Sequence, residues 1–309
     1  MNWFAKKSRK NEVVGVEFGA DGVAFAYVQR PAMEEPHLIH CEFLPFDASV
    51  NPADMLRNRL LKLGLQQVPC NMVLSYGHYQ LVLGEAPKVP DNELAEALRW
   101  RIKDMIQVPV GDAIIDAFLL PEDSARSSNR LAYAVVAQRP AVIEAIAQAK
   151  TAQLELLAID IPELAMRNLA LACCDSQRGI ALIHIGKNEG NLQIIVDNKV
   201  YLLRNFVLPY DAGLRDEIPA EALVLELQRS FDYFERQMRQ TPPAQVVLYG
   251  ENITLEKITD DIRNSLLVNI DVLDVHKGLQ INANVQEHTL FYCLRAVGAA
   301  LRQESVGAA

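Results

Sequence analysis

Two stretches of the chain carry short apolar runs that are interrupted by turn-forming residues. In residues 12–29, apolar runs precede and follow Gly19-Ala20-Asp21-Gly22, which has the composition of a tight turn. In residues 179–204, turn residues at 186–190 and 197–198 separate three apolar runs. The pattern predicts a β-hairpin in the first stretch and a three-stranded meander in the second.

Elsewhere, segments with strand spacing alternate with segments with helix spacing. Strand-like runs occupy residues 113–120, 131–136, 156–160, 246–249 and 269–273. Helical spacing follows Asp91, Pro140 and Pro162 and recurs in 222–239 and 290–301. This order predicts an α/β protein with interspersed antiparallel hairpins.

Two of these helices carry specific expectations. We expect Asp91 to cap the first helix, which its apolar spacing extends to a stop at Val108-Pro109. In the helix that Pro140 opens, Val142, Ile143 and Ile146 are expected to form the buried stripe.

The two hairpin stretches share a short sequence pattern. Val16-Glu17-Phe18-Gly19 and Ile183-His184-Ile185-Gly186 both read apolar, polar, apolar, glycine at the end of an expected strand. The match predicts an internal duplication. Two unrelated hairpins are the alternative, because four residues are a short pattern.

Composition and charge exclude several classes of protein. The chain has 309 residues, of which 50% are hydrophobic and 22% are charged, so extensive disorder and fibrous repeats are excluded. The 30 basic and 39 acidic residues give a net charge of −9, which argues against a nucleic-acid partner. The most apolar long window, residues 154–174, contains five charged or proline positions and is not expected to span a membrane.

The charge is unevenly distributed. Residues 1–10 hold four basic residues and no acid, so the remaining chain carries −13. Aromatic and basic side chains suit contact with an anionic membrane surface, and the residues expected to make it are Trp3, Phe4, Lys6, Lys7, Arg9 and Lys10. A solvated, disordered terminus is the alternative. No apolar signal region or cleavage site follows, so we expect a cytoplasmic protein with peripheral membrane association.

Standard catalytic and metal-binding motifs are absent from the sequence, and no catalytic residue or metal ligand is predicted. The remaining candidate chemistry lies in the two strand-end turns, whose backbone N–H groups suit phosphate binding. A carboxylate at a strand end suits Mg²⁺ or its water ligands. The candidate residues are Glu17, Gly19, Ala20, Asp21 and Gly22 in the first turn and His184, Gly186, Lys187 and Asn188 in the second. Ordinary turn glycines and a structural His184 are the alternative.

The order of these segments resembles the PilM family of type IV pilus assembly proteins, in the version found in mannose-sensitive haemagglutinin (MSHA) pilus systems. The likeness runs from about Val13 to Leu301, and its most specific parts are Leu98-Arg99-Trp100 and the segment 227–234, LQRSFDYF. The resemblance implies an actin-like, ribonuclease-H-like two-lobed fold. It assigns 13–77, 153–177 and 288–309 to lobe 1, 78–152 to an inserted 1C subdomain of the FtsA and PilM type, and 178–287 to lobe 2.

The resemblance also implies a function. Family members bind ATP between the lobes and act chiefly as adaptors on the cytoplasmic face of the inner membrane. They hold the N-terminal cytoplasmic segment of a PilN-like protein in a groove between subdomains 1A and 1C and work with other pilus assembly components. Arg99 and Trp100 are the partner-binding candidates, since Trp and Arg are favoured at binding hot spots. Burial of Trp100 on its own helix is the alternative.

This chain departs from the family pattern at all three nucleotide motifs. The first turn has Glu17 in place of Asp and lacks the hydroxyl residues, and the second has His184 in place of a carboxylate. The Gly-Gly pair on the adenosine side is replaced by Gly250 and Glu251. We therefore expect a non-enzymatic adaptor in which Mg·ATP hydrolysis is lost. Weak ATP binding through Lys187 stays open, and an active ATPase or phosphotransferase is the alternative.

Overall fold

The structure is a computed structural model that describes residues 11–47, 49–124, 130–266 and 268–303. Its contacts divide the chain into two compact units, which are described separately. Unit 1 comprises Met1–Tyr79, Gln138–Leu169 and Gly278–Ala309, and unit 2 comprises Gln80–Ala137 and Ala170–Lys277.

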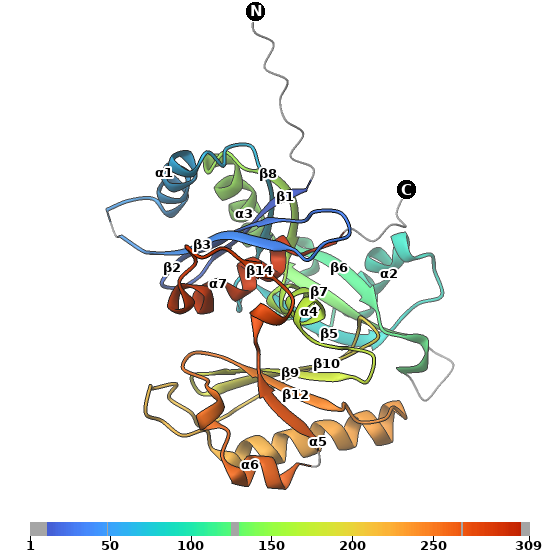
Figure 1. The fold of residues 1–309 in the computed structure, drawn as a ribbon. Helices are drawn as coiled ribbons and strands as arrows, with labels where there is room; N and C mark the ends of the chain where they lie inside the picture. The colour runs from blue at the N-terminus through green and yellow to red at the C-terminus, as the bar shows by residue number, and fades with distance from the viewer. Residues whose placement is uncertain (1–10, 48, 125–129, 267, 304–309) are drawn as a thin grey trace, which may run out of the picture. The chain divides into compact units, whose positions relative to one another are not determined.

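Unit 1 is built on a six-stranded sheet in the order β14-β3-β2-β1-β4-β8 (Figure 1). Its strands are β1 (Glu12–Phe18), β2 (Gly22–Gln29), β3 (His37–Pro45), β4 (Pro69–Val73), β8 (Glu155–Asp160) and β14 (Gln280–Ile281). Its helices are α1 (Pro52–Leu63), α3 (Arg139–Thr151), the first part of α4 (Pro162–Cys173) and α7 (Glu287–Ala300). The predicted hairpin is confirmed: β1 and β2 pair antiparallel from Glu12 opposite Gln29 to Phe18 opposite Val23.

Helix α7 packs closely against the sheet of unit 1. It lies on β1, β2, β3 and β4 and presents a run of small residues, Ala296, Gly298, Ala299 and Ala300. A Cβ atom added to Gly15 of β1 would collide with the carbonyl oxygen of Ala296, so glycine permits this close approach of backbones.

Unit 2 is built on a five-stranded sheet in the order β11-β10-β9-β12-β13. Its strands are β9 (Ile180–Gly186), β10 (Glu189–Val196), β11 (Lys199–Phe206), β12 (Gln245–Tyr249) and β13 (Asn269–Val272). The meander is confirmed, as is the long amphipathic helix, which is α5 (Ala220–Met238). Figure 1 shows α5 and the short α6 (Asp260–Ser265) along one face of this sheet, where α5 buries Leu223, Leu227 and Phe234.

The two sheets repeat one topology, which explains the shared sequence pattern. In unit 1, antiparallel β3-β2-β1 is followed by the parallel strands β4 and β8; in unit 2, antiparallel β11-β10-β9 is followed by the parallel strands β12 and β13. Glu17 lies beside Val73 of β4, and His184 lies beside Tyr249 of β12, so the two residues occupy equivalent positions. The topology supports the internal duplication.

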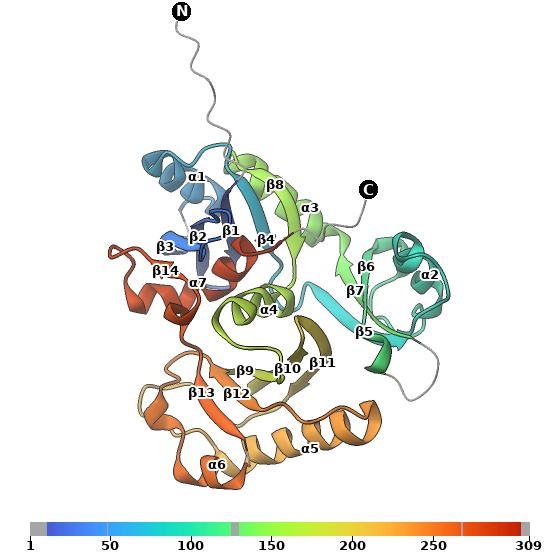
Figure 2. The same ribbon diagram turned by 45° about the vertical axis from the view of Figure 1, so that its right-hand side comes forward.

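A third sheet belongs to unit 2 and carries α2 (Leu94–Arg101). Its strands are β5 (Tyr79–Glu85), β6 (Ala113–Leu119) and β7 (Leu131–Gln138), in the order β5-β7-β6 (Figure 2). Short 3₁₀ helices occur at η1 (Asp91–Glu93), η2 (Val110–Asp112), η3 (Glu122–Ser124), η4 (Leu255–Lys257) and η5 (Val275–Lys277). α2 buries Leu94 and Leu98 in the core of this layer, together with Ile102 just beyond its end.

The expected first helix is shorter than its spacing predicted. Asp91 does not cap it but begins η1, and α2 ends at Arg101. Beyond that point the side chain of Gln80 donates to the carbonyl of Met105 and accepts from the N–H of Gln107, at 3.0 Å and 3.1 Å. These bonds hold the backbone of 105–107 outside a helix.

The buried stripe predicted for α3 was wrong at two of its three residues, while Val142 is half-buried. Ile143 and Ile146 are 57% and 50% exposed, whereas the fully buried side chains are Ala145 and Ala149. The structure also groups α3 with unit 1, because it packs on β8 and α1, although the resemblance implied that it belongs to the inserted subdomain. Within the part of the chain that the structure describes, no helix is both long enough and apolar enough to cross a membrane.

Candidate functional site

Glu17 lies at the end of β1 and is paired with a cation. Its side chain is buried, and its Oε1 lies 3.1 Å from Nη1 of Arg295, which α7 supplies. Burial raises the pKa of the Glu17 carboxyl, and the Arg295 guanidinium lowers it by a smaller amount. The carboxylate that was expected to hold Mg²⁺ is thus enclosed and already has a positively charged partner.

A second buried carboxyl lies in the same unit. Oε2 of Glu163, on the first turn of α4, accepts a hydrogen bond of 2.6 Å from the hydroxyl of Tyr79. Burial raises the pKa of Glu163, and the bond from Tyr79 and the charge of Arg295 lower it. The Arg295 guanidinium also lies 5.4 Å from the ring centroid of Tyr76. Arg295 therefore acts electrostatically on both buried carboxyls.

A third carboxyl of unit 1 has its own arginine. Asp160, the last residue of β8, is buried and lies 3.0 Å from Nη1 of Arg302. The sequence reasoning missed Arg295, Glu163 and Tyr79. The available signal was a charged residue inside an otherwise apolar helix, as in the α7 segment LFYCLRAVGAA.

The first turn is closed by its own hydrogen bonds. The N–H of Gly19 donates to the carbonyl of Gly22 at 2.9 Å, and the N–H of Phe46 donates to the carbonyl of Asp21 at 2.9 Å. The backbone N–H of Gly19, which was expected to face phosphate, is therefore occupied. The side chains of Ala20 and Asp21 are exposed at the tip, and Gly22 lies against Leu44, where a Cβ would collide.

In unit 2, His184 begins a row of polar side chains that crosses the sheet. Its Nδ1 lies 3.1 Å from Oδ1 of Asn191 on β10, and the Asn191 amide donates to Oδ1 of Asn205 on β11 at 2.9 Å. On the other side, its ring lies 5.1 Å from the ring of Tyr249 on β12. His184 is thus held in a hydrogen-bonded row.

The second turn presents an exposed cation at its tip, Lys187. Its Nζ lies 3.8 Å from Oδ1 of the exposed Asp211. Asn188 adopts a left-handed φ of 58° and donates its N–H to the carbonyl of Tyr210 at 2.8 Å, so it serves the turn geometry. The side chain of His184 closes the space over Gly186.

The loop after β12, which was expected on the adenosine side of a nucleotide site, has a packing reason for its glycine. A Cβ added to Gly250 would collide with the carbonyl oxygen of Ile185, whereas the adjacent Glu251 is exposed. Gly250 therefore permits the strand-end loop of β12 to pass close to β9.

The partner-binding candidates lie together on α2. Trp100 is 66% exposed, which excludes burial on its own helix. The Nε of Arg99 donates to Oε2 of Glu96 at 3.0 Å, so the guanidinium is held along the helix surface. Trp100 is the residue of this pair that is accessible to a partner. The membrane-contact candidates in 1–10 lie outside the described residues.

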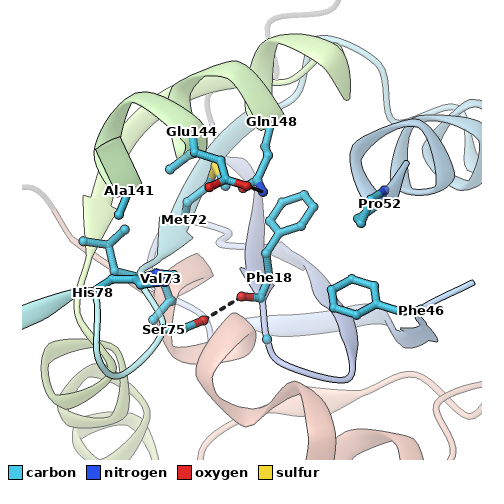
Figure 3. A pocket seen from close by; sticks show the side chains of 13 residues that line it. Phe18, Phe46, Pro52, Met72, Val73, Ser75, His78, Ala141, Glu144 and Gln148 are labelled. Carbon is cyan, nitrogen blue, oxygen red and sulfur yellow. Dashed lines mark hydrogen bonds between the residues drawn. The ribbon is translucent and has the colours of Figure 1, made fainter. Parts of the chain in front are cut away.

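Unit 1 also contains a cavity of about 190 Å³ beside the first turn (Figure 3). Phe18, Phe46 and Met72 form much of its apolar lining, and Figure 3 shows Glu144 and Gln148 reaching toward it from α3. The Ser75 hydroxyl donates to the carbonyl of Phe18 at 2.6 Å and fixes the adjoining strand ends. The lining thus combines apolar side chains with the polar side chains of Glu144 and Gln148.

The duplicated sheets define an actin-like α/β fold, which confirms the predicted fold class. Neither a protein-family model nor a curated protein matches the chain. Among solved structures, it is similar to a PilM–PilN type IV pilus biogenesis complex, with 18% identity, a TM-score of 0.69 and coverage of 94% of this chain and 97% of the other.

Two further structures share the fold. The cytoplasmic domain of EpsL, an inner-membrane component of the type II secretion system of Vibrio cholerae, has 11% identity and a TM-score of 0.50, with 95% and 96% of the two chains covered. A Bacteroides thetaiotaomicron protein of unknown function with an actin-like ATPase fold has 11% identity and the same TM-score of 0.50, with 94% and 100% covered. The PilM-like form of the actin-like fold is thereby supported.

Proposed function

We propose that this protein is an adaptor of a type IV pilus assembly machine and binds the N-terminal cytoplasmic segment of a PilN-like inner-membrane protein. The observation that carries the proposal is the likeness to the PilM–PilN structure along 94% of the chain. The likeness to the cytoplasmic domain of EpsL, an inner-membrane component of a type II secretion system, supports a role at that membrane. The protein acts at the cytoplasmic face of that membrane, beside other pilus assembly components.

The chemistry of the two turns favours an adaptor over an enzyme. Phosphoryl transfer needs a metal ion and a residue that positions the nucleophile. Glu17 is buried against Arg295, and His184 is hydrogen-bonded to Asn191. Glu17 is therefore not accessible to Mg²⁺, and His184 has no carboxylate to offer it. We assign the protein no hydrolytic activity and at most weak ATP binding.

The particular system is the finer part of the proposal. The segments around Trp100 and residues 227–234 are most like MshI, the PilM counterpart of MSHA pilus systems. The partner is accordingly the PilN-like protein of an MSHA-type machine.

A peptide titration tests the proposal. The N-terminal cytoplasmic segment of the PilN-like protein from the same pilus system is titrated into the full chain by calorimetry. We expect saturable binding that Trp100→Ala weakens by about tenfold or more, because an exposed Trp is a typical hot spot. Tyr233→Ala, which truncates an exposed aromatic residue on α5, is the matched control and leaves affinity unchanged.

Two outcomes would overturn the proposal. The first is the absence of peptide binding by the folded wild-type protein. The second is tight Mg·ATP binding with turnover that Glu17→Ala abolishes, which would restore the ATPase or phosphotransferase reading.

A further inference from the structure

The cavity beside the first turn lies outside the contacts used in the proposed function. Its lining comes wholly from unit 1: the ends of β1 and β4, the residue after β3, the start of α1 and the side of α3. Its volume of about 190 Å³ is below the roughly 300–1,000 Å³ of pockets that take whole small molecules. The cavity therefore has the size for a single side chain rather than for a nucleotide.

Two aromatic rings and a methionine form part of the cavity wall. Met72 is buried and Phe18 is half-buried, whereas Phe46 is 40% exposed and leaves a large apolar surface open to solvent. The faces of aromatic rings attract cations, most often the guanidinium of arginine. Long basic side chains also pack their apolar stems on such surfaces while their charged ends stay wet. The wall therefore suits a side chain with an apolar stem and a cationic end.

A carboxylate from α3 is directed into the same cavity (Figure 3). Oε1 of Glu144 accepts a hydrogen bond of 3.2 Å from Nε2 of Gln148, one turn later on the helix. Among the residues that the structure describes, no basic side chain pairs with Glu144. The other titratable group of the lining is the exposed His78. A guanidinium stacks on aromatic rings and pairs with a carboxylate, so this combination of groups matches arginine.

The loop that carries Phe46 is acidic. The N–H of Phe46 donates to the carbonyl of Asp21 at 2.9 Å, and Asp47 follows Phe46 in the chain. The side chains of Asp21 and Asp47 are both exposed. On α1, which begins at the cavity, Arg57 is already paired with Asp54 at 2.9 Å. A group that approaches along this loop meets negative charge, which favours a cationic occupant over a neutral or acidic one.

We propose that this cavity binds an arginine side chain presented by a protein partner. The guanidinium pairs with Glu144, which Gln148 orients, and stacks on the exposed ring of Phe46. The apolar stem of the arginine packs on Phe18 and Met72. The proposal goes beyond the adaptor function, whose expected hot spot lies on α2 of unit 2, because it adds a second binding site that unit 1 forms alone.

Short capped peptides test the site by NMR on the full chain, labelled with ¹³C at the methionine methyl groups. Met72 is the reporter because it lines the cavity, and Met72→Leu assigns its signal. We expect Ala-Arg-Ala to shift this signal saturably, with a dissociation constant in the millimolar range that is typical of so small a ligand. Ala-norleucine-Ala, which lacks the charge, should bind about fivefold or more weakly. Ala-Lys-Ala should also bind more weakly than the arginine peptide, because an ammonium group does not stack on a ring.

Glu144→Gln is expected to weaken the arginine peptide about fivefold or more and to leave the norleucine peptide unchanged. Glu155→Gln removes an exposed carboxylate of unit 1 outside the cavity and is the matched control, with wild-type affinity for both peptides. The assignment is overturned if the arginine peptide does not shift Met72, if the norleucine or lysine peptide binds as tightly, or if Glu144→Gln has no effect. Neither the PilN-like segment nor α2 enters this test, so its outcome is independent of the titration that tests the adaptor function.

Discussion

Equivalent positions in the two sheets have acquired different neighbours. Glu17 and His184 each end a central strand, but Glu17 lies beside Val73 and pairs with Arg295, whereas His184 lies between Asn191 and Tyr249. A buried carboxyl needs a partner for its charged form, whereas an imidazole can be satisfied by hydrogen bonds. The difference in residue type therefore explains the difference in the surrounding side chains.

At the residue scale, Glu163 makes folding stability depend on pH. Burial raises its pKa above the ordinary 4.5, so its contribution to stability is complete below that value and is lost as pH rises through the folded-state pKa. Glu163→Gln keeps an acceptor for Tyr79 but does not titrate. We expect its free energy of unfolding, relative to wild type, to increase from pH 4.5 upward in urea titrations.

Tyr79→Phe is the companion variant and acts in the opposite direction. The hydrogen bond from Tyr79 lowers the pKa of Glu163, so its removal raises that pKa further and extends the loss of stability to higher pH, with a larger total. Differences from wild type that stay constant with pH in both variants would contradict the role given to Glu163.

The sequence predicted which residues stand at the strand ends, but not what they contact. The short repeat located Glu17 and His184 correctly, because strand and turn patterns are local. Arg295 lies near the other end of the chain, and a lone charge in an apolar helix indicates a buried partner but not that this partner lies in β1. Contacts between distant segments depend on sheet topology, which the four-residue pattern only suggested.

At the element scale, the close packing of α7 depends on glycines, which have no side chain at the points where two backbones meet. Glycine at 15 lets the Ala296 carbonyl approach the strand, and glycine at 298 does the same for the carbonyl of Ala165 on α4. Such contacts hold backbones together more closely than ordinary side chains permit, and the neighbouring backbone atoms cannot move aside independently.

Gly15→Ala is therefore expected to destabilise unit 1. The added methyl group meets backbone atoms of α7, so we expect a loss of at least about 3 kcal/mol in the free energy of unfolding, the upper range for overpacking. Gly84→Ala in β5 is the control, because its Cβ would meet no atom within 4 Å, and it should change stability by less than about 1 kcal/mol. Equal effects of the two variants in urea unfolding would refute this packing argument.

Two helices show why periodicity alone predicts that a helix exists better than it predicts which side chains are buried or where the helix ends. The apolar pattern correctly located α3, yet its alanines face inward and Ile143 and Ile146 face solvent. A close-packed layer leaves room only for small side chains, and the sequence does not reveal that spacing. The helical pattern after α2 is interrupted for a different reason. The side chain of Gln80 on β5 forms hydrogen bonds with the backbone beyond Arg101, where α2 ends.

At the scale of the whole molecule, the repeated strand order was predictable in outline. Local patterns identified both hairpins and most of the strands, and the resemblance supplied their assembly into an actin-like fold. The unit boundaries were less accessible, because α3 follows the inserted segment in sequence but packs on the first sheet.

The uneven charge of the chain leads to a prediction about membrane binding. Residues 1–10 carry the basic and aromatic side chains, and each basic residue near an anionic surface contributes about 1 kcal/mol. Replacing Lys6 and Lys7 by Ala is expected to weaken binding to phosphatidylserine-containing vesicles about 30-fold at low salt, measured by co-sedimentation. Binding should also fall as salt shortens the Debye length to roughly 8 Å.

Lys103→Ala combined with Lys187→Ala removes the same charge outside the tail and is the matched control. Both lysines are exposed, and this variant should bind vesicles as wild type does. Equal losses in the two double variants, or binding that ignores salt, would exclude a specific contact by the tail.

The position of α7 in the chain has a consequence for synthesis on the ribosome. The strands of both sheets of unit 2 lie within residues 79–272, whereas the sheet of unit 1 is covered on one face by Glu287–Ala300. Domains fold as units while the chain emerges, at roughly 5–20 residues per second. Unit 2 can therefore complete its core first. Strands β1 to β4 are translated earlier, but one apolar face of their sheet stays uncovered until α7, near the end of the chain, has been translated.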